Sequence, residues 1–115
     1  MIVHNGRDFS FEAAQARKKR MKLVTRVVFP LTITKVGDRV CKFAVNLVDV
    51  EIPKGVKSIG NSAFSDCSCL TTVSFPKTLK SIGYVAFGGC WSLENVNLLH
   101  TNLQELGYAA FSDCM

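Results

Sequence analysis

An internal repeat constrains this chain more than any other feature of its sequence. The segment from Ile52 to Cys67 (IPKGVKSIGNSAFSDC) returns from Phe75 to Cys90 as FPKTLKSIGYVAFGGC, so the step from position 52 to position 75 is the period. A repeat of this length is one supersecondary unit that cannot bury its apolar face alone, whereas stacked units bury a continuous core. The repeat therefore predicts a solenoid.

The same register extends in both directions along the chain. Pro53 corresponds to Pro30 in the preceding unit, and Val73 corresponds to Val96 in the following one. One extra residue within 98–102 then moves the remaining matches one position further along. We therefore expect a leader over residues 1–26 and a repeat domain over 27–115, with units at 27–49, 50–72, 73–95 and an incomplete unit at 96–115.

Each unit combines a strand signal with turn signals. In Leu70–Pro76, Val73 and Phe75 alternate with polar residues, which is the period of a β-strand, and the proline ends the ladder because it has no N–H. Gly83 permits a turn, and the Ala-Phe-x-x-Cys segment after it suits one helical or 3₁₀ turn. The sequence thus predicts short parallel strands on one face of the solenoid, and turns with single helical or 3₁₀ turns on the other.

The unit LVDVEIPKGVKSIGNSAFSDC (residues 47–67) resembles the BspA-like class of leucine-rich repeats, whose pattern is LxxVxIPxxVxxIGxxAFxxC. The resemblance covers about residues 27–115 and is most specific in the two central units. In the first unit Val40-Cys41 replaces Ala-Phe, and Ala44 replaces the cysteine. The resemblance implies a right-handed leucine-rich-repeat solenoid that binds protein and has no catalytic residues.

In leucine-rich repeats, the residues between the inward positions of each strand face outward and can meet a partner. An ordinary solvated sheet face is the alternative interpretation. Trp91 would anchor an interface if it were exposed, and packing in the core is the alternative for this side chain. The predicted binding face consists of Arg26, Val28, Asp49, Glu51, Thr72, Ser74, Asn95 and Asn97.

The net charge of +5 comes entirely from the leader. Residues 1–26 hold seven Lys and Arg against two acidic residues, and residues 27–115 hold seven of each. This asymmetry fits a basic arm that binds nucleic acid or an anionic membrane. The alternative is a helix over residues 11–23 that covers the apolar edge of the first unit with side chains such as Met21. The polyanion patch would consist of Arg17, Lys18, Lys19, Arg20 and Lys22.

The cysteines and histidines offer little chemistry. Cys67, Cys90 and Cys114 take the same place in successive units, which predicts a column of thiols in the core. Their wide spacing lacks the close-spaced ligand pairs of zinc sites, and an odd count of cysteines without a signal peptide favours free thiols. Neither His4 nor His100 has a nucleophile or a carboxylate at a sequence spacing that would let the histidine act as a general base. We expect no enzymatic activity, metal or cofactor.

The apolar runs and the chain ends bear on location and assembly. No run approaches the ~20 residues of a membrane span, and the first residues lack a signal peptide, which predicts a cytoplasmic location with a nuclear or surface one left open. Met115 ends the chain before a further strand could form. Two interpretations stay open: the chain self-associates through its last unit, or it is a fragment of a longer repeat protein. We expect a non-catalytic module that binds a partner protein through its strand face, with polyanion binding through the leader as the alternative.

Overall fold

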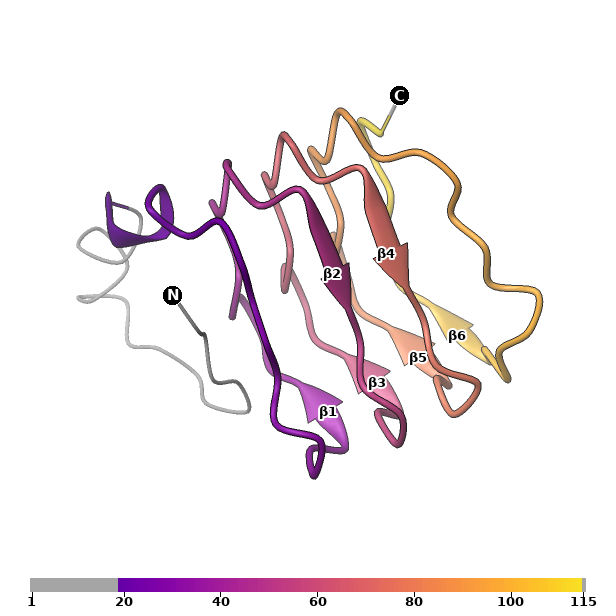
Figure 1. Cartoon of the computed structure of the whole chain (residues 1–115). Coiled ribbons are helices and arrows are strands. Elements are labelled where there is room, and N and C mark those ends of the chain that lie inside the picture. Colours follow the sequence, from indigo (N-terminus) through magenta and orange to yellow (C-terminus); the bar gives the residue numbers. More distant parts are fainter. Residues whose placement is uncertain (1–18, 115) are drawn as a thin grey trace.

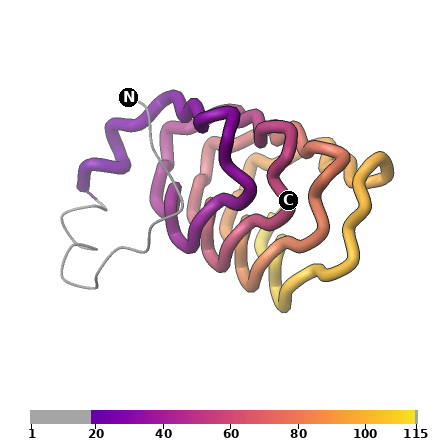
Figure 2. Tube along the Cα trace, turned by 90° about the horizontal axis from the view of Figure 1, so that it is seen from below, coloured from indigo at the N-terminus to yellow at the C-terminus, as the bar shows by residue number. Residues whose placement is uncertain are grey.

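The computed structural model describes residues 19–114, which wind into a solenoid of stacked coils. Figure 2 shows the coils side by side in chain order, from the indigo first coil to the yellow last one. This arrangement confirms the solenoid expected from the sequence period and the leucine-rich-repeat type that the resemblance implies.

Six short strands form two parallel sheets on different sides of the coils (Figure 1). The smaller sheet holds two strands and the larger one four, and every strand pairs with the equivalent strand of a neighbouring coil. The two-stranded sheet consists of β2 (Asp49–Glu51) and β4 (Thr72–Ser74). The four-stranded sheet consists, in order, of β1 (Lys35–Val36), β3 (Ser58–Ile59), β5 (Ser81–Ile82) and β6 (Glu105–Leu106).

Strand pairing follows the sequence period. Val50 pairs with Val73 and Ile59 pairs with Ile82, and both pairs are separated by one period of the repeat. Ile82 pairs with Leu106, which lies one position beyond the period because the last unit carries the extra residue. The register read from the sequence is therefore the register of the sheets.

A column of phenylalanine rings runs through the core on the side of the turns. Phe87 stacks on Phe64 and on Phe111, with ring centroids 5.2 Å apart in both pairs and planes within 5°. In the first coil the fully buried Cys41 takes the phenylalanine position. Phe29 then approaches Phe64 edge-on at 6.3 Å, so an aromatic side chain closes the column at that end.

The Ala-Phe-x-x-Cys segments form single turns whose backbones also bond to the next coil. In the second unit the Ser65 N–H donates to the Ser62 carbonyl at 3.2 Å, and the Phe64 N–H donates to the Ala86 carbonyl at 2.7 Å. Ser62 and Asp66 have left-handed φ angles of 57° and 62°. These conformations bracket the turn and prevent it from continuing as a helix.

The last unit departs from the predicted strand pattern. Residues 95–98 form no strand, and Val96, which the repeat register predicts to point inward, is 41% exposed. Asn97 accepts a hydrogen bond on Oδ1 from the Leu99 N–H at 3.1 Å. A local turn of this kind competes with strand pairing, so the prediction of a strand carrying Asn95 and Asn97 is wrong.

The end of the leader packs on the first coil. Residues 19–21 form a helical turn, and Met21 and Val24 are buried in the core. The Asn46 side-chain amide donates to the Lys22 carbonyl at 2.6 Å, which ties the leader to this coil. Met21 therefore contributes to the core as predicted. Residues 11–18 of the predicted helix lie outside the described residues, and residues 22 and 23 form a turn and not a helix.

Candidate functional site

The predicted binding face centres on the two-stranded sheet. Asp49 and Glu51 flank a buried valine on β2, and Thr72 and Ser74 do the same on β4, so all four side chains are exposed. The parallel register pairs Asp49 with Thr72 and Glu51 with Ser74. Two carboxylates thus lie beside two hydroxyls, and the structure brings these four residues together as the sequence indicated.

The outer members of the predicted face are exposed but do not extend the sheet. Arg26 and Val28 are exposed on either side of the buried Val27, which keeps the alternation without a strand. Asn95 and Asn97 are exposed on the irregular segment of the last unit. Within residues 19–114 the face therefore has two strands where four were expected.

Two hollows flank the exposed side chains of β2. The first has a volume of about 440 Å³ and is lined by Val28, Leu31 and neighbouring apolar residues. The second has a volume of about 380 Å³ and lies toward β4. Glu51 and Lys54 line both hollows. An acid and a base consequently separate two apolar depressions on one surface.

The second hollow has a histidine on its wall. The lining includes Phe75, Pro76 and Thr78, together with His100 from the insertion of the last unit. His100 Nε2 lies 2.6 Å from the Phe75 carbonyl oxygen, and it must be the donor because a carbonyl only accepts. The contact positions the imidazole at the rim of the hollow, whose described lining includes no nucleophile paired to it.

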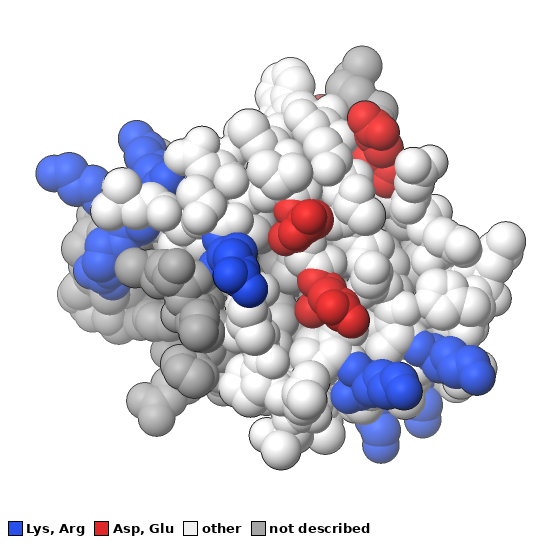
Figure 3. All heavy atoms as spheres, in the orientation of Figure 1, with Lys and Arg blue, Asp and Glu red and all other residues white. Residues whose placement is uncertain are grey.

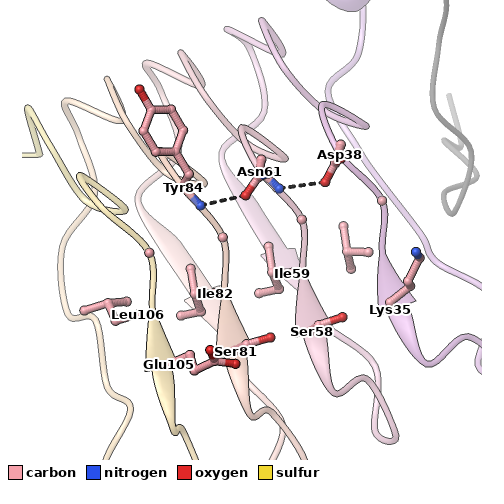
Figure 4. Close-up of a pocket in the computed structure, with 15 residues that line it drawn as sticks. Lys35, Asp38, Ser58, Ile59, Asn61, Ser81, Ile82, Tyr84, Glu105 and Leu106 are labelled. Atoms are coloured by element: carbon pink, nitrogen blue, oxygen red, sulfur yellow. Dashed lines mark hydrogen bonds between the residues drawn. The ribbon is translucent and has the colours of Figure 1, made fainter.

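A third hollow of about 540 Å³ lies on the four-stranded sheet (Figure 4). Ser58 and Ser81 line its floor from β3 and β5, whereas Lys35 and Glu105 come from the outer strands β1 and β6. Its lining of described residues holds no histidine or thiol that could activate the serine hydroxyls. This surface offers hydroxyl and charged side chains for hydrogen bonds.

Side chains on the wall of the third hollow link three coils. The Asn61 N–H donates to Asp38 Oδ1 at 2.8 Å, and the Tyr84 N–H donates to Asn61 Oδ1 at 2.8 Å (Figure 4). A Cβ atom added at Gly60 would lie 2.4 Å from Asp38 Oδ1, and one added at Gly83 would lie 2.6 Å from Asn61 Oδ1. The glycines that open this hollow are thus required by the close stacking of the coils.

Three exposed aromatic side chains are not among the residues of the predicted face. Trp91 is 61% exposed, which favours the exposed alternative over core packing, and its role as an anchor stays a prediction. Tyr84 and Tyr108 stack with centroids 5.8 Å apart while remaining 51% and 78% exposed. This pair was not predicted from the sequence, although both tyrosines follow the turn glycine of their units and the repeat register aligns them.

The predicted thiol column forms. Cys67 donates to the Cys41 carbonyl at 3.2 Å, and Cys90 donates to the Phe64 carbonyl at 3.1 Å, while Cys114 is only partly buried. Hydrogen bonding with Cys90, followed by burial, raises the pKa of Cys67 well above its ordinary value. Burial also raises the pKa of Cys114. Protonated thiols of this kind act as donors in the core, unlike catalytic thiolates.

The basic leader is described only in part. Lys19, Arg20 and Lys22 are exposed, whereas Arg17 and Lys18 lie outside the described residues. Polyanion binding by this patch stays a prediction. In the described part of the chain, no group of three or more His, Cys, Asp or Glu side chains is placed to hold a metal ion. None of the helical segments found between residues 19 and 114 is long and apolar enough to cross a membrane.

Comparison with known proteins supports the repeat assignment. Residues 19–115 match the family model of the BspA type leucine rich repeat region in six copies. A leucine-rich repeat protein from Bacteroides ovatus has 30% identity and a TM-score of 0.64 over 71% of this chain and 21% of its own. The T. pallidum leucine-rich repeat protein has 27% identity and a TM-score of 0.64 over 76% of this chain and 54% of its own. No curated protein sequence matches the chain.

Proposed function

The chain belongs to the BspA-type leucine-rich repeat family, and we propose that it is a non-catalytic module that binds a partner protein through the outer face of the β2–β4 sheet. Repeats of this type generally serve in protein interaction. The chain spans 21% and 54% of the length of the two solved structures, so the proposal concerns this module alone.

One observation carries the choice of surface. The exposed Glu51 lies between two depressions of about 440 and 380 Å³, whose accessible surface is largely apolar. Binding energy at protein interfaces concentrates where an apolar or aromatic anchor fills a pocket beside polar groups that fix its orientation. The two depressions can receive an apolar or aromatic anchor of a partner, and Asp49, Thr72 and Ser74 beside them are the polar groups that can fix its orientation.

The four-stranded sheet supports the same role less well. Its hollow is floored by Ser58 and Ser81 and by the glycine column, which explains its shape without a ligand. Small polar residues provide hydrogen bonds but little apolar area for a partner to bury. The two-stranded face is therefore the better candidate.

A pair of matched double variants tests this assignment. Asp49→Arg/Thr72→Arg places two large cations on the proposed face, and Ser58→Arg/Ser81→Arg places the same two on the four-stranded sheet. Proteins retained by the immobilised wild-type chain are identified by mass spectrometry, and the affinity of each purified partner is then measured by calorimetry. We expect the first variant to lose at least about tenfold in affinity and the second to bind like the wild type.

The opposite pattern contradicts the proposal. If partners tolerate arginines on β2 and β4 but are lost when arginines occupy the four-stranded sheet, the binding surface is the other one. Circular dichroism and urea unfolding of both variants establish that any loss reflects contact and not unfolding.

Self-association is a further proposal for the last unit. Leu99 is 97% exposed and Leu106 is 56% exposed, so this unit presents apolar area that a second copy would cover. Analytical ultracentrifugation tests it, because Leu99→Lys should reduce any dimer that the wild-type chain forms. A wild-type chain that stays monomeric at high concentration contradicts it.

A further inference from the structure

Four lysines gather at one corner of the solenoid. Lys54 and Lys57 lie in the loop after β2, and Lys77 and Lys80 lie at the equivalent positions after β4. All four side chains are exposed, and the Lys80 N–H donates to the Lys57 carbonyl at 2.8 Å, which sets that pair on adjacent coils. Figure 3 shows basic side chains gathered at the lower right, where Figure 1 places these loops. We call these four residues the lysine corner.

The lysine corner concentrates positive charge in a part of the chain with no net charge. Residues 27–115 hold seven basic and seven acidic residues, yet no acidic residue occurs in 52–65 or 75–93. Strands of adjacent coils lie about 4.8 Å apart, so like charges at equivalent positions repel one another. A bound anionic group relieves this repulsion.

The lysine corner adjoins the proposed binding face. Lys54 and Lys77 line the second hollow together with Glu51, Ser74 and Phe75. One continuous surface therefore runs from the exposed side chains of β2 and β4, across an apolar depression, to the lysines.

The charge pattern of this surface limits the length of the anion. Asp49 and Glu51 are exposed on β2, and Figure 3 shows acidic side chains near the middle of the view, adjacent to the basic group at the lower right. A long polyanion that continued from the lysines onto the sheet would meet these carboxylates and be repelled. The loops 53–57 (PKGVK) and 76–80 (PKTLK) also contain no aromatic residue on which nucleic acid bases could stack.

From these observations we infer that the lysine corner binds a short acidic segment of the partner protein. This inference rests on the proposed function, since it places the acidic segment beside the apolar side chain that enters the second hollow. The Glu51 carboxylate on β2 and the ammonium groups of Lys54 and Lys77 at the corner meet at the second hollow, and this order of opposite charges orients the partner and rejects the reversed pose.

A defined probe tests the inference without the partner. Binding of a fluorescein-labelled peptide of eight glutamates is measured by fluorescence anisotropy at low ionic strength, where exposed charges are least screened. The corner variant replaces Lys54, Lys57, Lys77 and Lys80 by glutamine. Two pair variants, Lys54→Gln/Lys77→Gln and Lys57→Gln/Lys80→Gln, each remove half of this charge. Their matched control, Arg39→Gln/Lys42→Gln, removes the same charge from the turn of the first coil.

We expect the corner variant to bind the peptide at least about tenfold more weakly, each pair variant at least about threefold more weakly, and the control to lose less than about twofold. Equal losses in a pair variant and in the control would mean that net charge alone attracts the peptide, which overturns the inference. A wild-type chain that does not bind the peptide at all overturns it as well. The pair variants Lys54→Gln/Lys77→Gln and Lys57→Gln/Lys80→Gln replace the fourfold variant if that one misfolds.

Two further measurements separate the remaining outcomes. If heparin or single-stranded DNA binds the corner more tightly than the peptide does, the ligand is a polyanion and the assignment to an acidic protein segment is wrong. The variant Asp49→Arg/Thr72→Arg leaves the lysine corner unchanged, so its effect on partner binding tests the proposed function separately. Failure of one proposal is thus distinguishable from failure of the other.

Discussion

Phe87 lies at the centre of the aromatic column and makes more ring contacts than any other described side chain. It is fully buried, stacks on Phe64 and Phe111 at 5.2 Å, and meets Phe75 edge-on at 5.8 Å. We expect Phe87→Ala to lower the free energy of unfolding by about 3–5 kcal/mol, because it leaves a cavity lined by other rings. The partly buried Phe111 is the control, and Phe111→Ala should cost about half as much in urea unfolding. Equal losses would contradict the column as the source of stability.

The thiol of Cys67 gives stability a pH dependence. Hydrogen bonding with Cys90 and burial raise its pKa in the folded chain, so above the ordinary thiol pKa of about 8.5 the unfolded chain releases this proton first. The unfolded state then binds fewer protons than the folded state, and the free energy of unfolding falls as pH rises. Urea unfolding between about pH 7 and about pH 10 should show a steeper fall for the wild type than for Cys67→Ala. Ala44 fills the same position in the first unit, so alanine suits this site, and identical slopes would contradict the prediction.

At the scale of the element, the glycine that follows β5 sets the distance between coils. A Cβ atom at Gly83 would lie 2.7 Å from the Asn61 backbone nitrogen and 2.7 Å from the Gly60 carbonyl carbon. We expect Gly83→Ala to lower the free energy of unfolding by about 1–3 kcal/mol, because the coils must separate to admit the methyl group. Ser81→Ala on β5 itself removes a partly exposed hydroxyl and should change stability by less than about 0.5 kcal/mol. Thermal unfolding of both variants measures the difference, and a neutral Gly83→Ala would show that the stacking is looser than described.

The strands differ in how far the sequence could predict them. Those at Asp49–Glu51 and Thr72–Ser74 were predictable, because a buried valine between two polar residues carries the period of a strand. The four-stranded sheet was not predicted, since its strands are only two residues long and a Ser-Ile pair contains no period. The strand expected at residues 96–98 failed because a side chain of the same segment bonds to the backbone there.

The candidate site was predictable to the same limited extent. Exposure of Glu51 and Thr72 follows from the period of their strands, and this part of the site could be identified from the sequence. The two hollows and the lysine corner depend on where loops of different units meet. Lys54 and Lys77 align in the repeat register, but only the structure shows that they line one depression.

At the scale of the whole molecule, burial is uneven along the solenoid. In residues 96–114 Ala110 is the one buried apolar residue that the structure describes, whereas the two central units bury a continuous set. Stability in such stacks is close to a sum of unit and interface contributions, so the last unit should open first. Hydrogen exchange followed by NMR should show the Gly83 and Phe64 amides, which bond to carbonyls of the central units, among the slowest and the amides of Thr101 and Asn102 among the fastest. Uniform protection across the chain would mean that the coils unfold as one block.

The regular stacking has a consequence for how such a chain changes over generations. The stacking of Phe64 on Phe87 has nearly the same geometry as the stacking of Phe87 on Phe111. The two surfaces of a central coil that contact its neighbours are therefore interchangeable with the corresponding surfaces of those neighbours. A duplication or deletion of one whole unit would therefore leave every remaining junction intact, whereas an insertion of another length must be absorbed in a loop, as at residues 98–102. Evolution can therefore lengthen or shorten the protein by whole repeat units. A unit copied from residues 50–72 would also bring another pair of lysines to the lysine corner.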